Sequence, residues 1–224
     1  MTKTSFHKSN KSSAIILFSF VVIAALIFYL TVLRPQQKYY NANHVNIHGV
    51  YLLKPIEINN FEFTDSHNNK FTKENLKGHW TMLYFGFTHC DVVCPVTMDT
   101  LNKMYLLLQN TTLKNNLPEI VLVSIDPERD TTKRLNDFVT SFNSNFIGVR
   151  SSIESTIALE KQLHIEAQTN QQGSNNFNLK HSADILLINP DAKIQAYFQY
   201  PQQPQQLAME YQSILSKLSN IDHE

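Results

Sequence analysis

The stretch FGFTHCDVVCP, residues 85–95, decides the fold and contains both cysteines of this 224-residue chain. The aromatic and apolar run at residues 80–87 predicts a buried strand, and Pro95 suits the first turn of a helix. Cys90 and Cys94 are therefore expected where a strand passes into a helix, at the carboxyl edge of a sheet. The free N–H groups and partial positive charge of a helix N-terminus favour thiolate over thiol. The stretch predicts a reactive pair or a metal clamp.

Strand-like and helix-like segments alternate beyond this stretch. The sequence predicts a hairpin at 61–64 and 70–72, a helix after Pro95, a strand at 119–125, a helix around 135–142 capped by Asp130, a strand at 146–149, a helix around 153–163, a hairpin at 183–188 and 193–199, and a last helix around 207–218. This alternation predicts an α/β sheet flanked by helices. Cysteines at the start of the first strong helix are typical of a thioredoxin-like fold.

An uncharged segment near the N-terminus predicts one transmembrane helix that precedes the folded domain. Residues 14–33 carry no charge, and at ~1.5 Å per residue they cover the roughly 30 Å of a bilayer core. A cleaved signal peptide is the competing interpretation, but its apolar core would be shorter, about 7–15 residues, and would end in a small-x-small site. Lysines 3, 8 and 11 precede the span, against Arg34 and Lys38 after it. This bias predicts a cytoplasmic N-terminus and a domain on the outer, periplasmic or equivalent, side.

The remaining length and composition predict one domain that does not bind nucleic acid. We divide the chain into a cytoplasmic tail (1–12), an anchor (13–33), a linker (34–52), one folded domain (53–220) and a short tail (221–224). The 19 basic residues balance the 19 acidic ones, so the electrostatic signature of nucleic-acid binding is missing from the sequence. Two cysteines are too few for a disulfide-stapled scaffold, and a domain of this size does not need one. The pair is interpreted as functional.

Two cysteines four residues apart support two chemistries. On one helical face their Cα atoms would lie about 6 Å apart, which a disulfide accepts. Reduced, the two sulfurs can instead converge on one metal ion. Structural zinc sites take four protein ligands, and the chain has no further cysteine. Soft thiolates select Cu(I), and two sulfurs with an imidazole also suit Cu(II), so copper is the metal that the donors favour.

A third ligand has several candidates. His181 lies where a polar loop, residues 168–178, enters a strand, and loops at such positions carry functional residues. His89 adjoins Cys90, but in a tight turn its side chain is expected to point away. The charged cluster at 126–130 is interpreted as a turn with an Arg–carboxylate pair and a helix cap. The alternatives are a surface for a partner protein, or residues beside the cysteine turn that support the metal ligands.

Three ordered motifs resemble the Sco/SenC family of membrane-anchored copper proteins, which have a thioredoxin-like fold. They are GFTHCDVVCP at 86–95, SIDPERDT at 124–131, and His181-Ser182 before a strand that ends at Asn189-Pro190-Asp191. The resemblance covers roughly residues 53–220, which it makes a thioredoxin-like copper-binding domain. It implies Cys90, Cys94 and His181 as copper ligands. It also implies a role in assembling the dinuclear copper centre of cytochrome c oxidase subunit II, by delivering copper or by reducing the cysteines of that subunit.

Two positions depart from the family pattern. Many relatives have proline after the first cysteine, where this chain has Asp91, and aspartate immediately before the histidine, where it has Lys180. A cation beside His181 would lower the proton affinity of the imidazole without removing the ligand.

We therefore expect a metallochaperone that binds Cu(I), Cu(II) or both, rather than an enzyme. The alternative is a thiol-disulfide oxidoreductase in which Cys90 and Cys94 are the catalytic pair. A copper or redox sensor that uses the same site is a third hypothesis.

Overall fold

The computed structural model describes residues 49–111, 116–165, 167–168, 180–181 and 183–221, together with residues 19, 22 and 23. Contacts divide the chain into two units, Met1–His44 and Val45–Glu224. Most of the anchor expected at 13–33 and most of the loop at 168–178 lie outside the described residues. Within the described ranges, no helix combines the length and the apolar character needed to cross a bilayer.

A mixed sheet of eight strands forms the centre of the second unit, in the order β1-β10-β9-β4-β5-β6-β2-β3. The strands are β1 (Gly49–Glu57), β2 (Glu62–Asp65), β3 (Lys70–Thr72), β4 (Thr81–Gly86), β5 (Glu119–Ser124), β6 (Ile147–Arg150), β9 (Ile185–Ile188) and β10 (Lys193–Phe198). Strands β4, β5 and β6 run parallel, whereas β9 is antiparallel to β4. A separate two-stranded ribbon joins β7 (Ala167–Gln168) to β8 (Lys180–His181).

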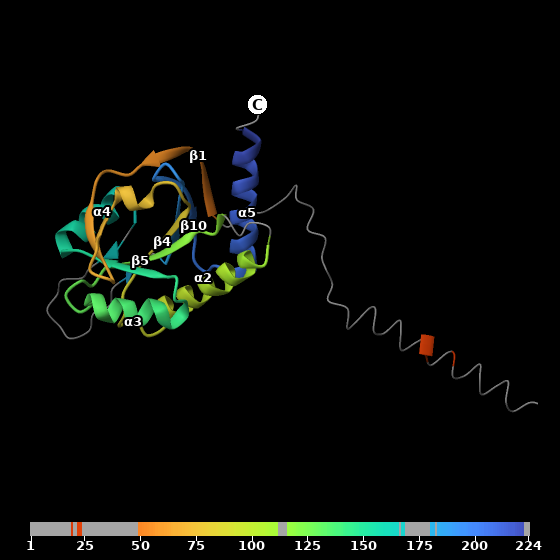
Figure 1. Cartoon of the computed structure of the whole chain (residues 1–224), viewed down its shortest axis with the longest axis horizontal. Helices are drawn as coiled ribbons and strands as arrows, with labels where there is room; N and C mark the ends of the chain where they lie inside the picture. The colour runs from red at the N-terminus through yellow and green to blue at the C-terminus, as the bar shows by residue number, and fades with distance from the viewer. Residues whose placement is uncertain are drawn as a thin grey trace, which may run out of the picture. The chain divides into compact units, whose positions relative to one another are not determined.

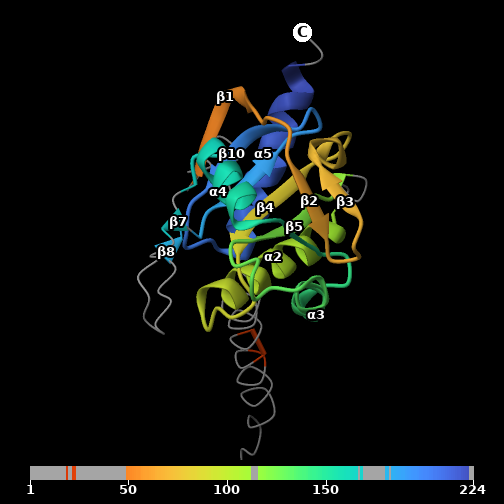
Figure 2. The ribbon, with the colours of Figure 1, turned by 90° about the vertical axis from the view of Figure 1, so that its left-hand side faces the viewer.

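Helices cover both faces of this sheet (Figures 1 and 2). They are α2 (Val93–Gln109), α3 (Thr132–Phe142), α4 (Ile153–Gln162), α5 (Pro204–Ile221) and the short 3₁₀ helix η2 (Lys73–Leu76). The connections β4-α2-β5 and β5-α3-β6 step across the sheet in the same direction, so right-handed crossovers put α2 and α3 on one face. Helix α2 packs against both α3 and α5, and α4 lies on the other side of the sheet.

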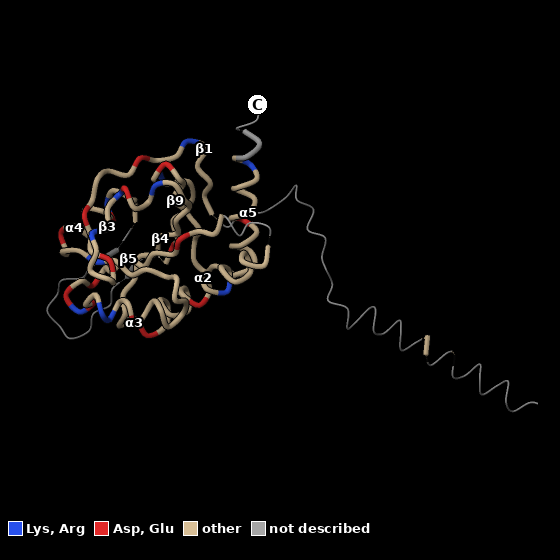
Figure 3. The backbone as a smooth tube through the Cα atoms, in the orientation of Figure 1, with Lys and Arg blue, Asp and Glu red and all other residues tan. Residues whose placement is uncertain are grey.

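The two central strands are buried along their whole length, because helices cover both of their faces. Every residue of β4 and of β9 is buried, which explains why these segments are apolar without alternation. Around this core, acidic and basic residues follow one another along the domain (Figure 3), in keeping with the balanced formal charge. The core thus fixes the strand ends from which the cysteine-bearing segment emerges.

Most of the predicted elements are confirmed, with differences at two places. Both hairpins form, β2 with β3 and β9 with β10, and the predicted helices and parallel strands are present. Strand β1 was not predicted, because it is only half-buried and contains Pro55. The prediction that Asp130 caps α3 is wrong: Thr131 is the N-cap, and its side chain accepts a hydrogen bond from the N–H of Arg134.

Candidate metal centre

The cysteines lie at the carboxyl end of β4, in and beside the segment that we call the cysteine turn, residues 87–92. Helix α2 begins only at Val93, so Cys94 is helical whereas Cys90 still belongs to the turn. The expectation that both occupy one helical face is therefore wrong. The turn nevertheless brings them together, because the N–H of Cys94 donates to the Sγ of Cys90 over 3.3 Å. Neither cysteine forms a disulfide.

The two thiols differ in their access to solvent. Cys90 is partly exposed, whereas the Cys94 side chain is fully buried. Burial raises the pKa of Cys94 to about 12, although a hydrogen bond from the Tyr84 hydroxyl works in the opposite direction. Burial also raises the pKa of Tyr84, and the neighbouring Cys94 adds to that rise. Cys94 is thus the sheltered thiol of the pair, and Cys90 is the accessible one.

Close packing behind Cys94 depends on Gly86, the last residue of β4. A Cβ at this position would lie 3.2 Å from the Cys94 sulfur, 2.9 Å from the Tyr84 ring and 3.1 Å from a Leu122 methyl group. These separations are shorter than ordinary contacts between such atoms. The glycine therefore lets the sulfur of α2 approach the strand backbone. Neither this role nor the Tyr84 contact was predicted, because both residues lie in the apolar run at 80–87, which the sequence predicts only as a buried strand.

A second segment, the carboxylate turn (residues 125–131), lies beside the cysteine turn because β5 pairs in register with β4, Gly86 opposite Ser124. Its Asp126 and Arg129 form the predicted ion pair, with 2.5 Å between the carboxylate and the guanidinium. Its Asp130 is completely buried and bonds to residues of the cysteine turn, with Thr88 Oγ1 at 2.5 Å. The side chain of His89 points to the same carboxylate, at 3.5 Å from Nδ1. The sequence placed Asp130 in the charged cluster but did not reveal that its partner is Thr88 of the cysteine turn.

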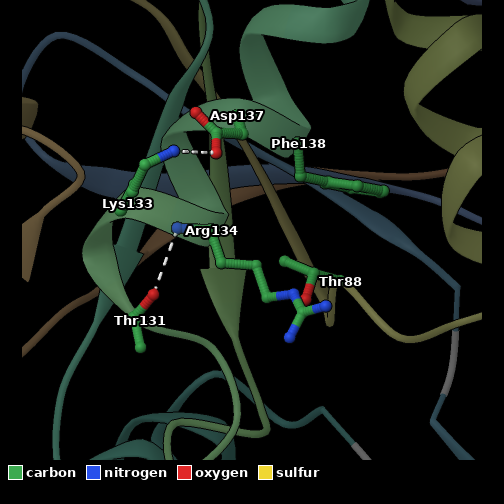
Figure 4. Close-up of a pocket in the computed structure, with 6 residues that line it drawn as sticks. All are labelled: Thr88, Thr131, Lys133, Arg134, Asp137 and Phe138. Atoms are coloured by element: carbon green, nitrogen blue, oxygen red, sulfur yellow. Dashed lines mark hydrogen bonds and ion pairs between the residues drawn. The ribbon is translucent and has the colours of Figure 1, made fainter.

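A shallow hollow of about 500 Å³ opens next to the two turns (Figure 4). Thr88 of the cysteine turn lines one part of it, and the first turns of α3 line the rest. The Arg134 side chain extends toward Thr88, while Lys133 pairs with Asp137 over 2.6 Å. The hollow therefore lies between the cysteine turn, at Thr88, and the start of α3.

The third predicted ligand, His181, is described only through its backbone. It pairs with Ala167 in the β7–β8 ribbon, which places it after the polar loop as the sequence suggested, and its side chain lies outside the described part of the chain. Within that part, no three His, Cys, Asp or Glu side chains cluster as a metal site. The sulfurs of Cys90 and Cys94 are the donors that the structure brings together, and soft donors of this kind fit copper.

Comparisons with known proteins agree with this fold. The SCO1/SenC family model matches residues 52–216. A protein of Stutzerimonas stutzeri named for copper binding is 30% identical over 152 residues, which cover 67% of this chain and 74% of that protein. The chain spans 41% to 55% of the length of three mitochondrial relatives.

Solved structures show the same fold. Arabidopsis thaliana ScoI with copper bound superposes with a TM-score of 0.66 at 23% identity, over 71% of this chain and 98% of that one. BsSco, described as a Sco-family cytochrome c oxidase assembly protein with a disulfide switch, gives a TM-score of 0.55 at 19% identity, over 71% and 94% of the two chains. With the family model matching most of its length, the chain belongs to the SCO1/SenC family and has its thioredoxin-like fold.

Proposed function

We propose that this protein is a copper metallochaperone in which reduced Cys90 and Cys94 hold the ion and His181 completes the site. The observation that carries the proposal is the contact of the two cysteines, with the Cys94 N–H aimed at the Cys90 sulfur over 3.3 Å. A helix N–H directed at sulfur interacts more favourably with a thiolate than with a thiol, and thiolates are the form that binds metal. Copper binding by relatives supports the same assignment.

We infer the partner from the family and the location from the uncharged N-terminal segment. Because a relative is described as a cytochrome c oxidase assembly protein, we infer that the cargo copper is destined for the dinuclear centre of subunit II of that oxidase. The uncharged segment 14–33 would anchor the chain with its N-terminus in the cytoplasm and the copper domain on the outer side. A tethered donor of this kind works close to a membrane-bound acceptor.

Copper titration of the full-length protein in detergent micelles, reduced beforehand, tests the ligand set. The wild type should bind one ion per chain. Cys90→Ser and Cys94→Ser should each weaken binding by at least ~100-fold, about 2.7 kcal/mol, because oxygen replaces a soft donor. His181→Ala should weaken it by a smaller factor, while His67→Ala, an exposed histidine in the β2–β3 turn, serves as the matched control. Unchanged affinity in Cys90→Ser would refute the assignment.

A thiol-disulfide oxidoreductase is the second candidate, and the unequal burial of the two thiols favours it. The Cys90 thiolate would attack a partner disulfide, forming a mixed disulfide and releasing one partner thiolate. Cys94 would then attack the Cys90 sulfur and expel the second partner thiolate, which takes up a proton. Two electrons pass to the partner, and the Cys90–Cys94 pair becomes a disulfide.

The histidine separates the two candidates. Reduction of a partner disulfide requires both cysteines but not His181, whereas copper delivery requires all three residues. Subunit II copper content should be measured in cells that carry Cys90→Ser, Cys94→Ser or His181→Ala, with and without added copper. Normal maturation in His181→Ala, together with its loss in either cysteine variant, would establish the redox function instead.

A further inference from the structure

Asp130 is a fully buried carboxylate whose hydrogen bonds go to the cysteine turn and to the end of β5. It accepts from the Thr88 hydroxyl at 2.5 Å and from the Thr88 N–H at 3.2 Å. It also accepts from the Ser124 hydroxyl at 2.7 Å and lies 3.5 Å from Nδ1 of His89. A buried carboxylate is costly unless such partners satisfy it. Asp130 can therefore be buried only because these hydrogen bonds satisfy its carboxylate.

Two of those partners, Thr88 and His89, immediately precede Cys90 in the chain. Thr88 and His89 link the end of β4 to the cysteine, and the backbone hydrogen bond from Cys90 N–H to Phe87 C=O in the same turn is long, at 3.4 Å. Asp130 comes from 42 residues further along the sequence than Thr88. Its own N–H is held by the carbonyl of Asp126 at 3.0 Å. Asp130, in the turn after β5, thus holds the segment that carries Cys90.

We propose that Asp130 is a positioning residue that holds the cysteine turn so that the Cys90 sulfur stays against Cys94 before any metal arrives. The inference deepens the proposed function, on which it rests for its biological purpose. Groups held in the correct geometry react or bind together far more readily than free ones. Without the carboxylate, the Thr88 hydroxyl and N–H lose their acceptor, and the Cys90 sulfur is free to move away from Cys94.

Ring closure in the metal-free protein tests the positioning role. Oxidised glutathione is added to the reduced full-length protein in detergent micelles. The Cys90 thiolate attacks it, forming a mixed disulfide and releasing one glutathione thiolate. Cys94, after losing its proton to solvent, attacks the Cys90 sulfur and expels the second glutathione thiolate. The rate of this closure, followed by acid quenching and mass spectrometry, reports how often Cys94 meets Cys90.

Asp130→Asn should slow closure by at least ~10-fold, since proximity is lost. Thr88→Val, which removes only the hydroxyl donor, should slow it by about threefold and keeps the test decisive if Asp130→Asn does not fold. Thr131→Ala is the matched control, because it weakens the same turn by removing the α3 cap without touching the carboxylate. It should lower the thermal midpoint and keep the wild-type closure rate.

Two results would overturn the proposal: wild-type closure rates in both Asp130→Asn and Thr88→Val, or equal slowing in Thr131→Ala. Copper titration of the same variants is scored separately. A wild-type protein that binds no copper would overturn the proposed function alone, because the closure measurement contains no metal.

Discussion

The cysteine turn and the carboxylate turn occupy equivalent places in the fold and are built differently. Each follows a parallel strand, β4 or β5, and each leads into a helix. Helix α3 starts with an ordinary cap, the Thr131 side chain accepting from the N–H of Arg134. Helix α2 has no side-chain cap at its N-cap, Val92, and one of its first N–H groups points to the Cys90 sulfur instead.

The difference shows that the two neighbouring turns have different roles. In the carboxylate turn, the Thr131 side chain satisfies the helix start, and Ser124 at the end of β5 donates a hydrogen bond to the buried Asp130. In the cysteine turn, the helix N–H is directed at a sulfur, and the turn depends on Asp130 of its neighbour for support. Uncapped helix N-termini favour negative charge. The free N–H groups at the start of α2 can therefore stabilise a thiolate in the cysteine turn, whether or not the thiolate binds a metal.

The largest expected effect concerns the two thiols of the cysteine turn. Because burial raises the Cys94 pKa from 9.0 to about 12, we expect iodoacetamide near pH 8 to modify Cys94 at least ~30-fold more slowly than an ordinary thiol. Cys90, which is partly exposed, should react first. Mass spectrometry of timed samples measures both rates, and the difference should vanish in urea. Equal rates in the folded protein would contradict the asymmetry.

The same pKa has a consequence for stability, with a definite sign. The folded state binds the Cys94 proton more tightly than the unfolded state does, so the associated stability is complete below about pH 9. It is lost as the pH rises from about 9 through about 12. Urea unfolding of wild type and Cys94→Ser across this range should show a steeper decline in the wild type.

The next effect tests the close packing that the cysteine turn requires. Gly86→Ala would place a Cβ 3.2 Å from the Cys94 sulfur and 2.9 Å from the Tyr84 ring. Such overpacking should lower the free energy of unfolding by about 1–3 kcal/mol and push the Cys94 sulfur outward. Urea unfolding measures the first change, and faster alkylation of Cys94 the second. An unchanged unfolding midpoint would show that the strand end can make room.

The sequence predicts the features that depend on neighbouring residues, and misses those that depend on contacts between distant parts of the chain. The strand before Cys90 and the helix after it follow from local apolar patterning. Asp130 looks like a helix cap because aspartate is common there, and Thr131 beside it satisfies the same rule. Its true partners, Thr88 and Ser124, become visible only once β4 and β5 are paired in register. The half-buried edge strand β1 was missed because its apolar residues do not alternate and Pro55 interrupts them.

A smaller effect tests how much the buried Asp130 carboxylate depends on its partner at the end of β5. Ser124→Ala removes the 2.7 Å hydrogen bond to Asp130 and takes one donor from a buried charge. We expect a loss of about 1–3 kcal/mol in unfolding free energy, measured by urea unfolding. Ser141→Ala is the control, since that exposed hydroxyl bonds only within its own helix, to the Phe138 carbonyl, and should cost much less. Equal losses in the two variants would mean that Asp130 does not depend on Ser124.

The smallest effect makes the two helix starts alike. Thr131→Ala removes the side-chain acceptor at the start of α3, 3.2 Å from the N–H of Arg134, so that α3 begins without a side-chain cap, as α2 does. The loss of such a cap costs about 1 kcal/mol. Because Thr131 lies outside the hydrogen bonds that join Asp130 to Thr88, the relative alkylation rates of Cys90 and Cys94 should stay at their wild-type values. A changed ratio would mean that the α3 cap also supports the cysteine turn, which would contradict the separate roles of the two turns.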